Sequence, residues 1–357
     1  MTDIGQIDKR LAVSTSFGRD DIVMHDPRQE PFTLYGVYYD YEKGVYRRMA
    51  EDIASTVNDG VKELSIHTAG GRVCFSTDAD AIAISCRRPT LWRMPHMALI
   101  GSAGFDLYIR GEDGKLTYYG VFMPNNDSKG YESIVSFPTR EKREILIHFP
   151  LYCAITELSI GLPEGASLEK WGGYKREKPI VFYGSSVTQG ACANTPGTDY
   201  IGRISRRFDT NYVNLGFSGS AKGEDTMMAY LASLDMSVFV YDYDYNAPTV
   251  EHLRKTHYKG YRTIRDAQPN LPIVICTMPN YDRLAVEAPA RRDVIAETYE
   301  RALAEGDQNV YFVDGKKVYT HFNADGGSVD GSHPNAYGFW RMAEAVGAEI
   351  AKIFGEE

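Results

Sequence analysis

The second half of the chain alternates between short apolar runs and longer segments with helical periodicity, and this alternation strongly constrains the fold. Each apolar run is four residues long and reads as a strand buried on both faces. The predicted strands are Ile180–Tyr183, Tyr212–Leu215, Val238–Tyr241, Ile273–Cys276 and Val310–Val313. The predicted helices are Tyr200–Phe208, Glu224–Leu234, Val250–Ala267, Ala290–Ala304 and Pro334–Phe354. This order predicts an α/β fold with a doubly wound parallel sheet covered by helices on both faces.

The first half, from about Thr33 to Leu162, is rich in strand-like segments instead. Short β-branched or aromatic runs are separated by Gly, Asp or Asn, at residues 35–41, 61–69, 71–78, 81–88, 105–111, 116–123 and 143–152. This regular spacing predicts an antiparallel β-sandwich or jelly roll. The hydrophilic connection Glu169–Lys178 marks a boundary between the two patterns. We therefore expect two domains, residues 1–172 and 173–357, as the length of 357 residues also favours.

Composition excludes several classes of partner. A formal net charge of −9 argues against nucleic acid and against an anionic membrane, because both need a basic face. The sequence lacks an apolar stretch of about 20 residues and a signal-peptide core, and its five cysteines form no C-x-x-C pair. We expect reduced thiols, a cytoplasmic location and a small-molecule substrate, and a homo-oligomer is compatible with the sequence. Cys192 is the cysteine near the candidate site below, and we interpret it as structural.

The first predicted strand of the parallel sheet runs directly into Gly184, Ser185 and Ser186. Open parallel sheets place their chemistry just beyond the carboxyl ends of the strands. Ser186 is therefore a candidate nucleophile whose backbone N–H is also available to donate. Strand–Gly–Ser turns are common in proteins without such chemistry. Whether Ser186 is a nucleophile therefore depends on the other segments that serine chemistry needs.

The next two strands also end in groups that suit a developing negative charge. Gly219 follows the second strand in a turn that can present backbone N–H groups outward, although a plain strand-to-helix turn explains it equally well. Asn246 follows the third strand, where its side chain would donate to an oxyanion or cap the next helix. The spacing of Asp242, Asp244 and Asn246 resembles the start of a calcium loop. We reject a calcium site because the required glycine and glutamate are missing at the sixth and twelfth positions.

Asp330 and His333 stand three residues apart in a glycine-containing loop before the last helix. This spacing lets one loop bring a carboxylate to Nδ1 of the imidazole and leave Nε2 for a serine hydroxyl. The other seven histidines are interpreted as surface or core residues. The chain has no H-E-x-x-H, P-loop or G-x-G-x-x-G motif, so we expect no metal and no cofactor. It also lacks G-x-S-x-G, which speaks against the standard α/β-hydrolase nucleophile turn.

Four sequence blocks have now been described: those of Ser186, of Gly219, of Asn246, and of Asp330 with His333. Their order along the chain resembles that of the SGNH/GDSL hydrolase family, and the resemblance covers about half the chain, from Pro179 onward. Ser186, in G-S-S-V, matches the family's nucleophile. Gly219 and Asn246 match its oxyanion donors, and the pair Asp330 and His333 matches the closing D-x-x-H. The resemblance implies a flavodoxin-like hydrolase domain that cleaves esters with a Ser-His-Asp triad.

The first half also resembles the β-sandwich that precedes this hydrolase domain in one subgroup, because Gly104–Tyr108 reads G-F-D-L-Y and matches its G-x-D-L-Y signature. Two departures from the family pattern occur. Ser185 stands where the family name has Asp, and the third block reads D-Y-N-A in place of G-x-N-D, which puts Asn246 in question.

The resemblance implies an esterase, and we expect it to remove a small acyl group, acetyl above all, from a carbohydrate or another polar alcohol. Tyrosines beside the site suit sugar rings, although packing in the core explains them as well: Tyr183, Tyr200, Tyr243 and Tyr245. Two alternatives remain open at this point. One is an acyltransferase that uses the same triad with an alcohol acceptor. The other is a sugar-binding protein in which the hydrolase half is inert.

Overall fold

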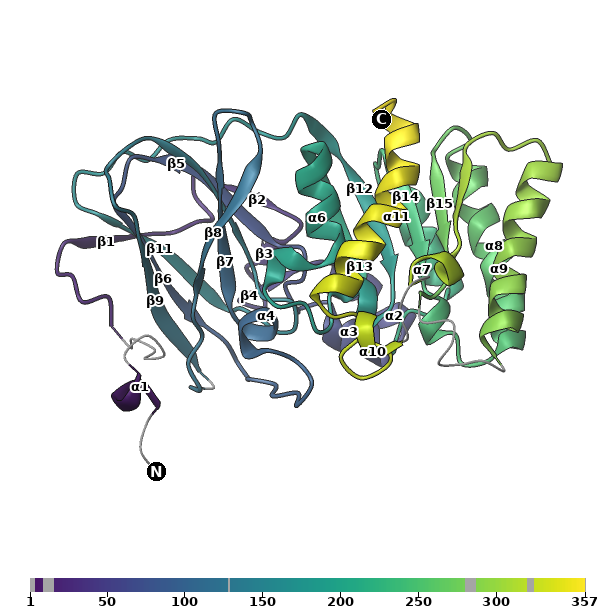
Figure 1. The fold of residues 1–357 in the computed structure, drawn as a ribbon, viewed down its shortest axis with the longest axis horizontal. Helices are drawn as coiled ribbons and strands as arrows, with labels where there is room; N and C mark the ends of the chain where they lie inside the picture. The colour runs from purple at the N-terminus through teal and green to yellow at the C-terminus, as the bar shows by residue number, and fades with distance from the viewer. Residues whose placement is uncertain (1–3, 9–15, 128, 280–286, 320–323, 357) are drawn as a thin grey trace.

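The computed structural model describes residues 4–8, 16–127, 129–279, 287–319 and 324–356. Antiparallel sheets form the first half of the chain and a parallel sheet between helices forms the second half (Figure 1). This confirms the predicted fold class. Among the described residues, no helix is both long and apolar enough to cross a membrane.

Two antiparallel sheets pack face to face in the N-terminal half. One has the strand order β1-β11-β6-β9 and the other β2-β5-β10-β7-β8, beside a small β3-β4 hairpin. Their inward side chains form one apolar core that includes Phe75, Ile84, Leu107, Ile145 and Ile160. The strands are β1 (Ile22–His25), β2 (Thr33–Tyr35), β3 (Tyr38–Asp40), β4 (Val45–Arg47), β5 (Arg72–Thr77), β6 (Ala81–Arg87), β7 (Phe105–Arg110), β8 (Leu116–Phe122), β9 (Gly130–Ser136), β10 (Arg143–His148) and β11 (Glu157–Pro163).

The described residues of this half also form four short helices: α1 (Ile4–Ile7), α2 (Glu51–Val57), α3 (Asp59–Leu64) and α4 (Leu99–Ala103). The strand predicted at residues 61–69 is wrong, because its first four residues end α3. Val61 and Leu64, three apart, face the core together, which is a helical spacing. The side chain of Asn58 caps this helix by accepting the backbone N–H of Val61 at 2.9 Å.

The parallel sheet has the strand order β13-β12-β14-β15-β16, and all four of its strand pairs are parallel. This is the flavodoxin-like order, in which the ligand crevice lies where the strand order reverses. Here that point is the carboxyl end of β12, between β13 and β14. The strands are β12 (Arg176–Gly184), β13 (Thr210–Gly216), β14 (Val238–Asp242), β15 (Ile273–Cys276) and β16 (Val310–Val313). Because β12 starts at Arg176, it begins inside the predicted connection.

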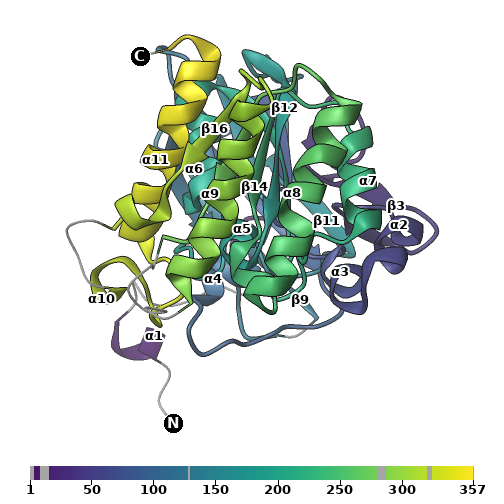
Figure 2. The same cartoon turned by 90° about the vertical axis from the view of Figure 1, so that its right-hand side faces the viewer.

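Alternating side chains of each strand face opposite helical layers. In β12, Ile180 and Phe182 pack toward α6 and α11, whereas Val181 and Tyr183 pack toward α7, α8 and α9. Figure 2 shows α6 and α11 on one side of the sheet and α7 and α8 on the other. The α-helices are α5 (Ser186–Gln189), α6 (Tyr200–Phe208), α7 (Asp225–Ser233), α8 (Val250–Ala267), α9 (Ala288–Ala304), α10 (Ala324–Gly327) and α11 (Ala336–Phe354), and the 3₁₀ turns are η2 (Pro196–Thr198), η3 (Asp244–Asn246) and η5 (Gly315–Lys317).

Buried polar side chains join the two halves near the carboxyl ends of the parallel strands. Arg48, between β4 and α2, donates to the carbonyl oxygens of Asn214 at 3.0 Å and Gly216 at 2.8 Å. Asp106 of the G-F-D-L-Y segment accepts the backbone N–H of Gly197 in η2 at 2.8 Å. The sandwich therefore holds the loops on both sides of the end of β12.

Candidate active site

Ser186 is the first residue of α5 and lies directly beyond the carboxyl end of β12. The turn needs glycine at position 184, because a Cβ there would lie 2.3 Å from the carbonyl oxygen of Asp242. The hydroxyl of Ser185 accepts the backbone N–H of Val187 at 3.2 Å and caps the short helix. Ser186 is 8% exposed, so the surrounding protein covers most of its surface.

The D-x-x-H loop brings Asp330 and His333 to this serine. Ser186 Oγ lies 3.0 Å from His333 Nε2, and His333 Nδ1 lies 2.8 Å from Asp330 Oδ2. The other carboxylate oxygen of Asp330 accepts the backbone N–H groups of Ser332 at 2.9 Å and His333 at 2.8 Å. Partial burial opposes ionisation of Asp330, but these N–H groups and the imidazole outweigh it and hold the pKa of the carboxyl well below its usual value.

Gly219 and Asn246 lie beyond the two strands that flank β12. Gly219 has a left-handed φ of +67° and is exposed, with open space where a Cβ would stand. Asn246 ends η3, and its amide donates to the carbonyl oxygen of Phe217 at 2.8 Å, which joins the two loops. Asn246 does not cap the next helix, because the side chain of Thr249 does so. The structure thus gathers all five candidate residues at the carboxyl ends of β13, β12 and β14 and in the loop before α11.

The sandwich also reaches this site, through residues that sequence reasoning did not single out. The phenol of Tyr152 donates to the carbonyl oxygen of Ser186 at 3.2 Å. Gln189 of α5 donates to Leu151 O at 3.2 Å and accepts the backbone N–H of Ser218 at 3.0 Å. These contacts hold the segment of the nucleophile against the loop that carries Gly219.

His96 is the residue that sequence reasoning missed most clearly. It lies between β6 and α4, yet its ring centroid is 5.4 Å from that of His333. Cys192 is beside both, and its Sγ donates to the backbone carbonyl of His96 at 3.3 Å. No local motif marks His96, because the contact joins segments about 100 to 240 residues apart in the chain.

The tyrosines named from the sequence are mainly packing residues. Tyr183, Tyr200 and Tyr243 are buried, and Tyr245 is half-buried. Two aromatic side chains with more exposed surface are Trp92, whose ring contacts His67, and Tyr337, four residues after His333.

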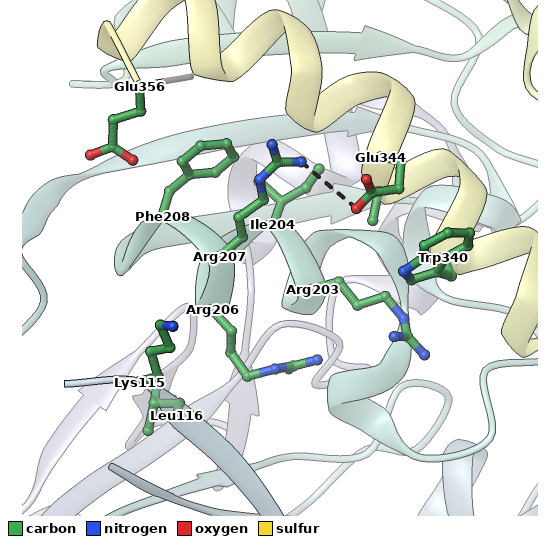
Figure 3. A pocket seen from close by; sticks show the side chains of 11 residues that line it. Lys115, Leu116, Arg203, Ile204, Arg206, Arg207, Phe208, Trp340, Glu344 and Glu356 are labelled. Carbon is green, nitrogen blue, oxygen red and sulfur yellow. Dashed lines mark ion pairs between the residues drawn. The ribbon is translucent and has the colours of Figure 1, made fainter. Parts of the chain in front are cut away.

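A cleft of about 550 Å³ lies elsewhere, between α6, α11 and the start of β8 (Figure 3). It contains none of the five candidate residues. Its arginines already have partners: Arg206 donates to Gly197 O at 2.6 Å, and Arg207 forms an ion pair with Glu344 at 3.7 Å. We therefore place the chemistry at Ser186 and not in this cleft.

A parallel sheet with Ser, His and Asp gathered at its switch point defines a hydrolase-like fold and site. The sequence model of the GDSL-like lipase/acylhydrolase family matches residues 177–351, and the model of the N-terminus of SGNH hydrolase-type esterases, GxDLY, matches residues 22–168. The chain belongs to the SGNH/GDSL hydrolase family, in the subgroup with an N-terminal GxDLY domain. It is an enzyme that acts on ester bonds, so the non-catalytic alternative loses its support.

Solved structures agree with this assignment. A protein described as a GDSL-like lipase from Bacteroides ovatus is 28% identical, with a TM-score of 0.84 over 94% of this chain and 99% of that chain. The salicylyl-acyltransferase SsfX3 of a tetracycline biosynthetic pathway is 18% identical, with a TM-score of 0.76 over 94% and 98%. A family two carbohydrate esterase from Clostridium thermocellum is 15% identical, with a TM-score of 0.58 over 81% and 94%. No curated protein matches the sequence.

Proposed function

We propose that the enzyme is a serine esterase that hydrolyses small acyl esters, acetyl esters above all, of a carbohydrate or another polar alcohol. The observation that carries the proposal is the continuous hydrogen-bonded line from Ser186 Oγ through His333 to Asp330, with separations of 3.0 and 2.8 Å. In such a line the imidazole accepts the serine proton while the carboxylate fixes its tautomer and stabilises the imidazolium.

The reaction has two halves. Ser186 Oγ attacks the ester carbonyl and passes its proton to His333 Nε2, which then protonates the leaving alcohol. The acyl group remains on Ser186 until a water molecule, deprotonated by His333, attacks it and releases the carboxylic acid. Asp330 stays ionised throughout, in keeping with its lowered pKa.

The negative oxygen of each tetrahedral intermediate needs donors on the opposite side. We assign the backbone N–H groups of Ser186 and Gly219 and the amide of Asn246 to this oxyanion hole. The hydrogen bond from Asn246 to Phe217 O uses one N–H of the amide and orients the other. The D-Y-N-A departure from the family pattern is compatible with this role, because the asparagine is still anchored to the loop of Gly219.

The polar-alcohol part of the proposal rests first on two aromatic side chains: Trp92, whose ring contacts His67 beside Gln189 of α5, and Tyr337, four residues after His333. Half-exposed aromatic side chains, Trp92 and Tyr337, offer flat faces with polar edges of the kind that suit sugar rings. Proteins with this fold include carbohydrate esterases, one of them solved with cellohexaose. The fold also includes a salicylyl-acyltransferase that spans both domains, so transfer of the acyl group to an alcohol is the second candidate.

Aryl acetate hydrolysis tests the mechanism. Ser186→Ala and His333→Ala should each lower kcat by several orders of magnitude with folding intact. Ser332→Ala is the matched control, because it keeps the backbone N–H that binds Asp330. Unchanged hydrolysis in Ser186→Ala would remove the proposal.

Product analysis with alcohol acceptors separates the two candidates. An esterase should release free acid as the main product over a series of acetylated sugars, and should lose rate as the acyl chain lengthens. If ester exchange with an added sugar or phenol outpaces hydrolysis, the enzyme is an acyltransferase.

A further inference from the structure

Two side chains that the reaction does not use share the space around the catalytic base. His96, Cys192 and His333 each offer one metal-ligand atom, and these three atoms all lie within 4.8 Å of one another. No other group of three or more His, Cys, Asp or Glu side chains in the described part of the chain meets the same closeness. Two imidazoles and a thiol are the donor set that Zn²⁺ and similar cations prefer.

The three ligands come from three separate segments. His96 belongs to the sandwich, Cys192 follows α5, and His333 precedes α11. Cys192 has a left-handed φ of 70°, which is uncommon for a residue other than glycine, and its Sγ contacts the His96 carbonyl. The rings of His96 and His333 are tilted by 35° and face the same space.

We propose that His96, Cys192 and His333 bind a borderline divalent cation such as Zn²⁺, and that the bound ion switches the esterase off. His333 would coordinate through Nε2, since Nδ1 already faces Asp330 at 2.8 Å. Nε2 also carries the lone pair that takes the proton of Ser186. A metal ion on that lone pair therefore competes directly with the serine hydroxyl, and the triad has no general base while the ion is bound.

The dimensions fit after a small adjustment. Zn–N bonds of about 2.0 Å and Zn–S bonds of about 2.3 Å place the two nitrogens of a tetrahedral site about 3.3 Å apart and each nitrogen about 3.5 Å from the sulfur. In the structure the three ligand atoms lie within 4.8 Å of one another. His96 is half-buried in a loop, and rotation of its side chain brings its ring nitrogen closer to the other two ligand atoms. The Asp330 carboxylate adds negative charge near the ion.

Binding must displace the thiol proton. Burial, and after it the charge of Asp330, raises the pKa of Cys192 to about 12, so the metal-free thiol is protonated at neutral pH. The cation takes the place of that proton, which leaves to solvent, and water fills the fourth coordination position.

Inhibition, though not metal binding itself, rests on the proposed function, and the two are measured separately. In the aryl acetate assay, Zn²⁺ should inhibit the full-length enzyme. Mg²⁺ should not, because it prefers oxygen ligands. His96→Gln and Cys192→Ala should each raise the half-inhibiting Zn²⁺ concentration at least about tenfold, measured against the metal-free rate of the same variant. His25→Gln, which changes another half-buried histidine of the sandwich, is the matched control and should leave the half-inhibiting Zn²⁺ concentration unchanged.

Co²⁺ absorption tests binding without activity. Wild-type protein should show a thiolate-to-cobalt charge-transfer band that Cys192→Ala loses. Ser186→Ala should keep the band and bind more tightly, because the hydroxyl no longer competes for Nε2. Absence of the band in wild-type protein, or equal Zn²⁺ inhibition of wild-type and both ligand variants, would overturn the metal site. A band without inhibition would overturn the switch, whereas the role of His333 as the base is tested by the His333→Ala assay described above.

Discussion

Asp106, the aspartate of the G-F-D-L-Y segment, provides a direct test of how the sandwich supports the hydrolase half. It is fully buried, and its two carboxylate oxygens serve two partners from different parts of the fold. One oxygen lies 2.8 Å from His148 Nδ1, and the other accepts the backbone N–H of Gly197 at 2.8 Å. Burial, partly offset by Asp106, lowers the pKa of His148 and so favours its neutral imidazole.

Asp106→Ala should lower the free energy of unfolding by about 2–6 kcal/mol. The change leaves two buried donors without acceptors, at about 1–3 kcal/mol each. Asp106→Asn should cost less, since its carbonyl oxygen can still accept from Gly197 while its amide donates to the other tautomer of His148. Urea denaturation of the variants measures the difference. Asp113→Ala, an exposed aspartate in the turn after β7, is the control and should stay within about 0.5 kcal/mol of wild type.

Gly197 lies between the nucleophile segment and α6, so loss of this contact should also reduce kcat/KM for aryl acetates before the protein unfolds. If Asp106→Ala has the same free energy of unfolding as the wild-type protein, the predicted role of this carboxylate is refuted. Such a result would mean that water or a local shift satisfies both donors, and that the signature aspartate does not join the two halves.

Two further predictions concern carboxyl groups of the hydrolase half. Asp330→Asn should lower kcat by about 10⁴-fold, because an amide facing Nδ1 favours the tautomer whose Nε2 is protonated and unable to accept from Ser186. A loss below tenfold in a kcat measurement would instead indicate a Ser–His dyad. Burial raises the pKa of Asp242 to about 7, above an unfolded value of about 3.9, so its contribution to stability falls as pH rises from about 4 to about 7. Asp242→Asn should therefore show a smaller fall in Tm between pH 5 and pH 8, and equal slopes in both proteins would contradict the assignment.

Much of the hydrolase half was predictable because its signals are local. The predicted bounds of α6, α8, β15 and β16 agree with the structure, since each element carries a complete periodic pattern. Asp330 and His333 were predictable as a pair because three residues of one loop suffice to join them. The prediction that Ser186 meets them depended on the topology of parallel sheets, which sets strand ends side by side.

The sandwich was harder to predict, and so was its part in the site. The weak alternation of β1, β9 and β11 did not mark them as strands, and residues 61–64 have apolar spacing that fits a helix better than a strand. His96 and Tyr152 reach Ser186 and His333 only because the two halves pack together. No spacing along the sequence encodes that packing. The catalytic roles of Gly219 and Asn246 stay predictions, since what the structure supplies is their position at neighbouring strand ends.

The loop that carries Asp330 and His333 affects which sequence changes this enzyme can tolerate. Asp330 accepts backbone N–H groups of its own loop and also orients the imidazole of His333, which belongs to the same loop. The carboxylate and the imidazole therefore keep their relative positions through contacts within this loop. Any shift of the loop carries both groups along and alters chiefly the gap to the serine. Natural variation or engineering can therefore reshape the surrounding pocket widely, provided that this one separation is preserved.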